Sequence, residues 1–354
     1  MEFLYSNLPP IKTKYPTFYE TFYSLIPEAT RLDIAVGYIT ADSLVELHQA
    51  IIQNSSIETL NLVIGMHRWE KFTRMEYEAA MQLNEFLLKE KRGEVRLVTP
   101  FRFHGKLYSY SNAQGAFAGI IGSNNLSSIV DSRNRIYEAS TLFRERDCTV
   151  KMREFIESLI EDATDNIADC NIVGFKNAGR LLEDHENVEE VTQSQLSDCI
   201  SNLSDEHYLI PLVKDGSVPQ KSNLNTFFGK GRLNKDKGVV RPRHWYEVEI
   251  IVPKTITCQN GYPIKGTPSA VFEVITDDRW KFSCKVSGDY SKNLRSEDDL
   301  KILGKWIKGR LENHGALKIG DPITPDTFNR YGRDNFEMTK TNTPNLWYLD
   351  FGVE

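Results

Sequence analysis

The first half of the chain alternates short apolar runs with amphipathic segments. Each uninterrupted run of β-prone residues predicts a buried strand, and the spacing of apolar residues between the runs predicts helices. The expected strands are 32–39, 60–65, 94–98, 103–110, 116–121 and 136–143. The expected helices are 16–26, a second one that Thr40 or Asp42 caps and that runs through Ile52, then 70–91 and 149–166. Strands and helices in this order predict an α/β sheet domain with helical crossovers.

The second half is patterned mostly as β-structure. Strands are expected at 207–212 and 245–252, and two β-prone runs within 272–284 predict a hairpin. One helix is expected from Ser296 to His314, with Ser296 as its N-cap. The sequence therefore predicts a second, mainly β domain.

Length and charge indicate where these halves meet. At 354 residues the chain is longer than a single core comfortably supports. Residues 151–200 carry twelve acidic against four basic side chains, and 183–195 has the composition of a solvated linker. We therefore expect a first domain at 1–180, an acidic linker at 181–200 and a second domain at 201–354.

Composition excludes several classes of protein. No run approaches the ~18 apolar residues that cross a membrane, and the N-terminal residues lack the regions of a signal peptide. The five cysteines are scattered, as is typical of reduced thiols rather than of a zinc site or a disulfide framework. Neither a phosphate-loop motif nor an H-E-x-x-H metal motif is present. We expect a cytoplasmic protein without a metal or other cofactor.

A histidine and a lysine lie two residues apart within one expected strand. Side chains at positions i and i+2 of a strand leave the same face, so His104 and Lys106 point into one space. The lysine is a compact cation for phosphate oxygens, and a neutral imidazole can attack phosphorus or relay a proton. Taken alone, the pair is also what an ordinary surface strand carries by chance.

The next strand and turn favour phosphate chemistry. Gly122-Ser123-Asn124-Asn125 follows the strand 116–121, and Glu138 comes a short way on. A turn of small residues after a buried strand exposes polar groups at the strand's end, where ligands bind in sheet proteins. H-x-K, then G-S-x-N, then a glutamate closely resembles the active-site signature of the phospholipase D superfamily. The resemblance implies metal-free phosphoryl transfer through a phosphohistidine intermediate.

The resemblance also implies a role for each residue of the motif. His104 would be the nucleophile, and Lys106 and Asn125 would hold the non-bridging oxygens. Ser123 would support the phosphate. Glu138 would orient the imidazole, as a carboxylate does for other catalytic histidines.

Two departures from the superfamily pattern qualify this assignment. The full motif has an aspartate five residues after the lysine, where this chain has Ser111. That loss argues against a lipid-acting member more than against a nuclease. The spacing between Asn125 and Glu138 indicates a small loop insertion, Asp131 to Arg135.

Two stretches of the second half are unusually basic. Residues 221–243 carry seven lysines and arginines against one acid, and 285–295 form a milder cluster. Glycines and Asn234 interleave with these cations, as expected where backbone approaches phosphates closely. The alternative is a charged, solvated surface. The candidate DNA-contacting residues are Lys221, Lys230, Arg232, Asn234, Lys235, Lys237, Arg241, Arg243, Lys285, Lys292 and Arg295.

The second half also resembles the plant B3 (B-three) DNA-binding fold. The resemblance lies in Trp280-x-Phe282, the basic stretches and Leu303-Gly304-Lys305-Trp306-Ile307-Lys308. That pseudobarrel holds the major groove between two loops, and the resemblance implies that 221–243 is the N-arm and 285–295 the C-arm.

Residue type divides the expected contacts within these arms. An arginine can make bidentate contacts to guanine, so Arg232 and Arg243 are expected to read bases, followed by Lys230 and Lys235. Lysines such as Lys237 and Lys292 are expected to neutralise phosphates.

A phospholipase D-like motif joined to a B3-like domain resembles the BfiI and NgoFVII type of restriction endonuclease, over nearly the whole chain. Only one H-x-K is present, and the chemistry requires two histidines, one to attack phosphorus and one to protonate the leaving oxygen. We therefore expect a homodimer, formed through the first domain, in which two copies of His104 face each other. The expected activity is metal-independent, sequence-specific hydrolysis of double-stranded DNA.

The expected partners follow from the same resemblance. They are double-stranded DNA, a cognate DNA methyltransferase and, as for some members of this type, a separately encoded helicase-like ATPase. Two alternatives stay open. One is a DNA-binding regulator whose phospholipase D-like domain is inactive and serves for dimerisation. The other is a lipid-acting phosphodiesterase, which would need a second H-x-K or a membrane surface.

Overall fold

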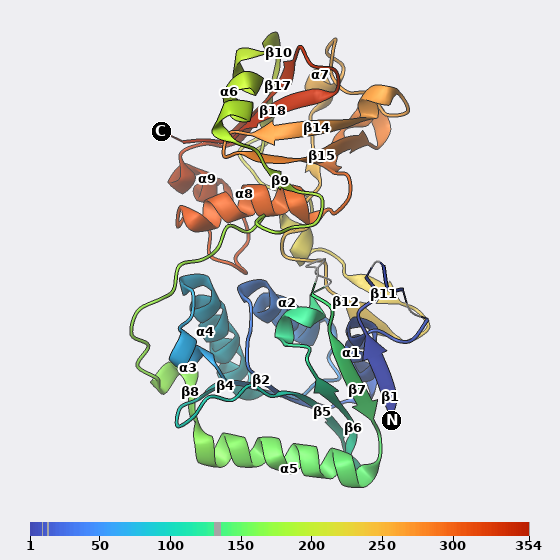
Figure 1. Ribbon diagram of the computed structural model, residues 1–354, viewed down its shortest axis with the longest axis vertical. Coiled ribbons are helices and arrows are strands. Elements are labelled where there is room, and N and C mark those ends of the chain that lie inside the picture. Colours follow the sequence, from blue (N-terminus) through green and yellow to red (C-terminus); the bar gives the residue numbers. More distant parts are fainter. Residues whose placement is uncertain (9, 13, 131–135, 354) are drawn as a thin grey trace. The chain divides into compact units, whose positions relative to one another are not determined.

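The computed structural model describes residues 1–8, 10–12, 14–130 and 136–353, so the expected insertion at 131–135 lies outside the described residues. The chain forms two compact units (Figure 1). The first is Met1–Ala178 with Gly231–Pro242, and the second is Gly179–Lys230 with Arg243–Glu354. The chain therefore passes between the units three times, after residues 178, 230 and 242.

The first unit is built on an eight-stranded mixed sheet, in the order β1-β7-β6-β5-β2-β3-β4-β8 (Figure 1). Its strands are β1 (Glu2–Tyr5), β2 (Arg31–Val36), β3 (Thr59–Ile64), β4 (Gly93–Val98), β5 (Lys106–Asn112), β6 (Gly115–Gly122), β7 (Ala139–Phe143) and β8 (Thr164–Asn166). The central strands β2, β3 and β4 are parallel, and the flanking strands pair antiparallel. The α/β prediction is confirmed.

Helices connect these strands and cover the sheet. They are α1 (Phe18–Leu25), α2 (Ala41–Gln53), α3 (His67–Glu70), α4 (Arg74–Lys89) and α5 (Arg146–Ala163), with short 3-10 turns η1 (Ile26–Glu28), η2 (Leu126–Ile129) and η3 (Ile167–Asp169). Helix α5 runs across one face of the sheet (Figure 1), where Met152 and Ile156 pack against Ala35, Val63 and Leu107.

The helix expected over 70–91 begins later, at Arg74 of α4, after the separate short helix α3. Lys71 has a φ of 66°, which ends α3, and Thr73 then starts α4 with a capping box. The Thr73 hydroxyl accepts a hydrogen bond from the Glu76 amide at 3.1 Å, and the Glu76 carboxylate accepts one from the Thr73 amide at 2.7 Å.

The second unit is a curled, mainly β half-barrel in the strand order β10-β17-β18-β14-β15-β16-β13, with β9 paired to β15. Its strands are β9 (Glu189–Glu190), β10 (Leu203–Pro211), β13 (Ile250–Ile251), β14 (Val271–Thr276), β15 (Trp280–Ser287), β16 (Asn293–Ser296), β17 (Asn335–Thr341) and β18 (Leu346–Asp350). The hairpin expected within 272–284 is confirmed as β14 and β15.

Several helices and turns complete the second unit. They are α6 (Gln193–Ser201), α7 (Lys254–Thr257), α8 (Lys301–Asn313), α9 (Pro325–Tyr331), η4 (Asn223–Phe228), η5 (Pro268–Ala270) and η6 (Asp289–Ser291). The segment expected to be an acidic linker, 181–200, contains β9 and most of α6. Val191, Leu196 and Cys199 of this segment pack with Ile275 in a small apolar cluster.

Two local predictions in this unit were wrong. Of the strand expected at 245–252, only β13 forms, because Trp245 and Tyr246 donate hydrogen bonds to the buried Glu312 of α8, at 2.7 and 2.9 Å. Ser296 is not a helix N-cap. It ends β16, and its hydroxyl donates to the Asp299 carbonyl at 2.6 Å, so that α8 begins later, at Lys301.

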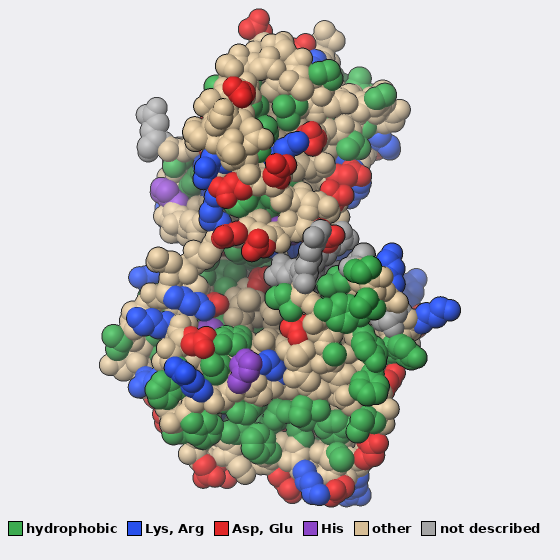
Figure 2. All heavy atoms as spheres, in the orientation of Figure 1, with side chains coloured by type: hydrophobic (Ala, Val, Ile, Leu, Met, Phe, Trp, Pro, Cys, Tyr) green, Lys and Arg blue, Asp and Glu red, His purple; other side chains and the backbone are tan. Residues whose placement is uncertain are grey.

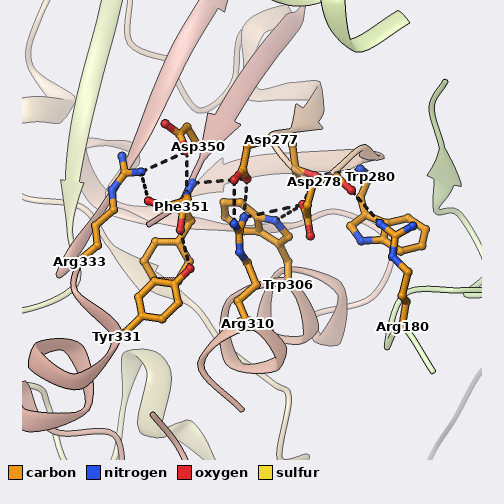
Figure 3. Close-up of polar contacts among 12 residues, drawn as sticks. Arg180, Asp277, Asp278, Trp280, Trp306, Arg310, Tyr331, Arg333, Asp350 and Phe351 are labelled. Atoms are coloured by element: carbon orange, nitrogen blue, oxygen red, sulfur yellow. Dashed lines mark hydrogen bonds and ion pairs between the residues drawn. The ribbon is translucent and has the colours of Figure 1, made fainter. Parts of the chain in front are cut away.

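Polar contacts join α8 to the sheet in the region of the B3 resemblance (Figure 3). The Arg310 guanidinium makes two hydrogen bonds to Asp277, at 2.5 and 2.8 Å, and the Trp306 indole donates to Asp278 at 2.9 Å. A Cβ on Gly304 would lie 1.7 Å from the Tyr246 carbonyl oxygen. Only glycine permits this close approach of α8.

The remaining sheet is a two-stranded hairpin, β11 (Arg232–Asn234) and β12 (Val239–Arg241). We refer to Gly231–Pro242 as the inserted hairpin, because it belongs to the first unit although its sequence neighbours belong to the second. Its turn is closed by the Asn234 side chain, which accepts hydrogen bonds from the amides of Asp236 and Lys237 at 3.1 and 3.2 Å.

Candidate active site

The residues of the motif lie together at one edge of the first sheet. Strand β6 pairs antiparallel with both β5 and β7, so the start of β5, the end of β6 and the start of β7 lie at the same edge. The five motif residues flank these strand ends: His104, Lys106, Ser123, Asn125 and Glu138.

His104 and Lys106 meet directly. The Lys106 Nζ lies 3.0 Å from the His104 Nε2 and donates a second hydrogen bond to the His104 carbonyl at 2.9 Å. Only Lys106 lies in β5. His104 precedes the strand, in a segment that pairs with the end of β2 through a 3.0 Å bond from the Gly37 amide to the Gly105 carbonyl. The prediction that both residues lie within the strand was therefore wrong, although the two side chains do converge.

Burial perturbs the Lys106 ammonium. The residue is 7% exposed, and the loss of solvation lowers the pKa of Lys106 from its ordinary value. The negative charge of Glu138 has a smaller, opposite effect and raises this pKa. A lysine in this state is a strong donor toward an incoming anion, because fewer water molecules compete for its protons.

Asn125 is oriented by a residue that sequence reasoning missed. The Tyr38 amide donates to the Asn125 Oδ1 at 3.1 Å, which fixes the orientation of the Asn125 side-chain amide. The Tyr38 ring also lies edge-on to the His104 imidazole, with centroids 5.5 Å apart, and its hydroxyl donates to Glu70 at 2.8 Å. Tyr38 lies within the strand expected at 32–39, but β2 ends at Val36, two residues before it.

The loop between β6 and β7 is held by a hydrogen-bond network around Asn124. The buried Asn124 Oδ1 accepts from the Ser140 hydroxyl at 2.5 Å, and its carbonyl accepts from the Tyr108 hydroxyl at 2.9 Å. Burial, and then the charge of Glu138, raise the pKa of Tyr108 well above its usual value, so this hydroxyl remains a donor. The network fixes the backbone that carries Ser123 and Asn125.

Ser123 and Glu138 are also tied to this edge. The Ser123 hydroxyl accepts from the Ala139 amide at 3.0 Å, and the Glu138 amide donates to the Ser6 hydroxyl at 2.9 Å. The Glu138 carboxylate interacts electrostatically with Lys106. In the part of the chain that the structure describes, it makes no hydrogen bond with His104.

The candidate DNA-contacting residues fall into both units. The first unit contains Arg232, Asn234, Lys235, Lys237 and Arg241 of the inserted hairpin, and the second contains Lys221, Lys230, Arg243, Lys285, Lys292 and Arg295. The expected N-arm is therefore divided between the two units, which its sequence gave no reason to expect.

Some of these cations already have acidic partners. The Arg243 guanidinium binds Glu247 with two hydrogen bonds, at 2.9 and 2.5 Å, and Glu247 is 2% exposed. These bonds raise the pKa of Arg243. Lys285 pairs with Glu297 at 3.1 Å. By contrast, Lys235 and Lys237 are exposed at the turn of the inserted hairpin.

Comparison with known proteins decides the family. Residues 17–198 match the N-terminal PLD domain of the NgoFVII restriction endonuclease, and residues 200–342 match the NgoFVII C-terminal B3-like DNA-binding domain. The chain belongs to the NgoFVII restriction endonuclease family. It is therefore a nuclease that joins a phospholipase D-like domain to a B3-like DNA-binding domain, and its partner is DNA.

Solved structures give weaker likenesses. The first unit resembles Nuc from Salmonella typhimurium, a phospholipase D family member, at 13% identity and a TM-score of 0.30, over 47% of this chain and 95% of that chain. It also resembles a phosphatidylserine synthase from Haemophilus influenzae Rd KW20, at 12% identity and a TM-score of 0.35, over 48% of this chain and 41% of that chain. A search of curated protein sequences finds no match.

None of the helices in the described part of this restriction endonuclease is both long and apolar enough to span a membrane.

Proposed function

We propose that this restriction endonuclease hydrolyses double-stranded DNA at a specific sequence through a covalent phosphohistidine on His104, without a metal ion. The observation that supports it best is the 3.0 Å contact between the His104 Nε2 and the Lys106 Nζ at a sheet edge that also carries Asn125. A nucleophile, a cation and an amide donor thus converge where a phosphodiester could bind.

The proposed reaction has two steps. The His104 Nε2 attacks phosphorus, forming an N–P bond and breaking the bond to the leaving oxygen, which takes a proton from a second histidine. Water then attacks the phosphohistidine, gives its proton to the same second histidine and releases the imidazole. Lys106 and the Asn125 Nδ2 stabilise the charge that grows on the non-bridging oxygens in both steps.

A second copy of the chain would supply the second histidine. Hydrophobic side chains gather on one face of the first unit (Figure 2). Three exposed apolar side chains belong to segments near His104: Phe101 in the connection that leads to His104, Ile121 on β6 and Phe155 on α5. Phe155 lies against Phe103, the residue before His104, with ring centroids 6.4 Å apart. An exposed apolar surface beside an incomplete site fits a two-fold dimer interface.

For target recognition we propose Arg232, followed by Lys230 and Lys235, as base-reading residues, with Lys237 and Lys292 on phosphates. Arg243 would have to leave its ion pair with the buried Glu247 before it could reach a base. A cognate DNA methyltransferase and a separately encoded helicase-like ATPase complete the proposed system. Gel-shift assays with base-substituted duplexes test Arg232, whose replacement should reduce discrimination at one position by about 1–3 kcal/mol.

The central experiment is DNA cleavage in the presence of EDTA. We expect the wild-type enzyme to cut a susceptible plasmid equally well with and without the chelator. His104→Ala should abolish cutting and still bind the target in a gel shift. His207→Ala, which replaces an exposed histidine on β10, is the matched control and should cut normally. Loss of cutting in EDTA would refute the metal-free mechanism.

The shared site has its own test. A heterodimer of one wild-type chain and one His104→Ala chain would contain a single His104, and we expect it to be inactive because both histidines are needed in each step. Half of the wild-type activity in such a heterodimer would mean that each chain carries a complete site.

A further inference from the structure

A pocket of about 400 Å³ adjoins the candidate active site in the first unit. It is lined by the end of β1, the start of α1 and Glu138. Lys106 begins β5 and Glu138 precedes β7, two strands away in the sheet, which corresponds to roughly 10 Å. The distance from Lys106 to the Glu138 side of the pocket is therefore similar to the distance between neighbouring nucleotides in one DNA strand.

One lining residue comes from far along the chain. Arg241 belongs to β12 of the inserted hairpin, which contacts α1 and α2 (Figure 1). The Asn54 Nδ2 donates to the Val240 carbonyl at 2.8 Å, and the Val240 amide donates to the Asn54 Oδ1 at 2.9 Å. The Arg241 guanidinium then lies over the Tyr19 ring, 5.1 Å from its centroid. Together these contacts fix an arginine at the pocket.

The charged side chains of the pocket, Glu20, Glu138 and Arg241, differ in whether they have polar partners. The Glu20 carboxylate accepts hydrogen bonds from the Thr17 amide and hydroxyl, at 3.4 and 3.2 Å, and Glu138 interacts with Lys106. Among the described residues, the buried Nε of Arg241 has no hydrogen-bond partner. A partly buried guanidinium whose Nε lacks an acceptor, beside a site for phosphodiesters, is suited to bind an anion.

We propose that Arg241 binds the DNA phosphate next to the scissile phosphate and thereby positions the strand for attack by His104. This inference rests on the proposed function. Arg241 is then a positioning residue that acts on every DNA sequence. It differs in this from Arg232, Arg243, Lys230 and Lys235, which were expected to read bases. A segment within the DNA-recognition half of the sequence thus completes the catalytic unit.

Two substrates separate this role from others. A susceptible plasmid has a phosphate next to every scissile bond, whereas bis(4-nitrophenyl) phosphate has only the phosphate that reacts. For Arg241→Ala we expect kcat/KM on plasmid to fall between ten- and a hundredfold, because misplacement of a reacting group costs on this order. The loss on the small diester should be much smaller. Arg241→Lys, which keeps the charge, should recover part of the plasmid activity.

Salt dependence supplies a readout that a merely structural role would not change. Removal of one phosphate contact should reduce the slope of log kcat/KM against log salt on plasmid by about 0.9. Arg74→Ala is the matched control, because Arg74 in the same unit also stacks on an aromatic ring, Phe175, at 5.0 Å, but lies outside the pocket. It should keep the wild-type slope and rate.

Two results would overturn the proposal. One is plasmid cleavage by Arg241→Ala at the wild-type rate. The other is an equal loss on both substrates in Arg241→Ala and in Arg241→Gln, which keeps most of the side-chain stem. Failure of the proposed function is distinguishable, since it would appear in the wild-type enzyme as loss of plasmid cutting in EDTA, or in His104→Ala as retained cutting.

Discussion

The Asn54 side chain, at the C-cap of α2, bonds to the inserted hairpin, and its replacement should loosen the hairpin by a predictable amount. The Asn54 amide group makes two hydrogen bonds to the backbone of Val240 and a third to the Ala50 carbonyl within its own helix. Asn54→Ala removes both bonds to the hairpin. At about 1 kcal/mol for each neutral hydrogen bond, the attachment should weaken by about 2 kcal/mol.

Hydrogen exchange at the Val240 amide measures this change directly. Because about 1.4 kcal/mol corresponds to a tenfold change in an equilibrium constant, exchange should accelerate roughly 30-fold. Asn54→Asp keeps an acceptor for the Val240 amide but loses the donor to its carbonyl, so it should give an intermediate rate. Plasmid cleavage should fall in the same order, because a detached hairpin withdraws Arg241 from the pocket.

The matched control is Asn84→Ala. Asn84 is a fully buried asparagine of the same unit, and its side chain bonds to Val95 and Asn166 instead of to the hairpin. Its replacement should leave Val240 exchange at the wild-type rate. If Asn54→Ala left the Val240 amide as protected as in the wild type, the attachment would not depend on these hydrogen bonds and the reasoning would be refuted.

Two further predictions concern the active site itself. A Cβ on Gly65 would lie 2.0 Å from the Phe103 carbonyl oxygen, so Gly65→Ala should displace the segment that carries His104. This variant should no longer cut plasmid but should still bind the target in a gel shift. Normal cutting would show that the segment tolerates the added methyl group. Burial lowers the pKa of Lys106 from 10.5, so its ammonium is lost as the pH rises through that lowered value. The cleavage rate should therefore decline as the pH is raised, and the decline should begin at a pH below 10.5. Lys106→Arg should move the decline to higher pH, and an identical pH profile in both enzymes would assign the decline to another group.

The sequence predicted the two-domain fold class and the place of the motif residues, for a physical reason. H-x-K and G-S-x-N are short spacings next to strand ends, so strand geometry carries both motifs to the same sheet edge. The family match confirms the fold and the nuclease activity. The individual roles of His104, Lys106, Ser123, Asn125 and Glu138 remain predictions.

Other features could not be predicted from the sequence. Tyr38 orients Asn125 through a backbone amide, which every residue except proline possesses, so its identity carries no signal. Asn54 and Val240 are 186 residues apart, and neither has a composition that marks it for the other. A local pattern predicts strands and helices, but pairings at this separation depend on how the whole chain folds.

The three passages of the chain between the units limit how such enzymes can be recombined. A chimaera that joined the catalytic unit of one family member to residues 179–354 of another would also exchange the inserted hairpin. Positions 19 and 54 of the retained catalytic unit would then contact residues 241 and 240 of a hairpin from the other family member. To change target specificity while retaining cleavage, a designer would keep Gly231–Pro242 with the acceptor and transplant Gly179–Lys230 and Arg243–Glu354 around it.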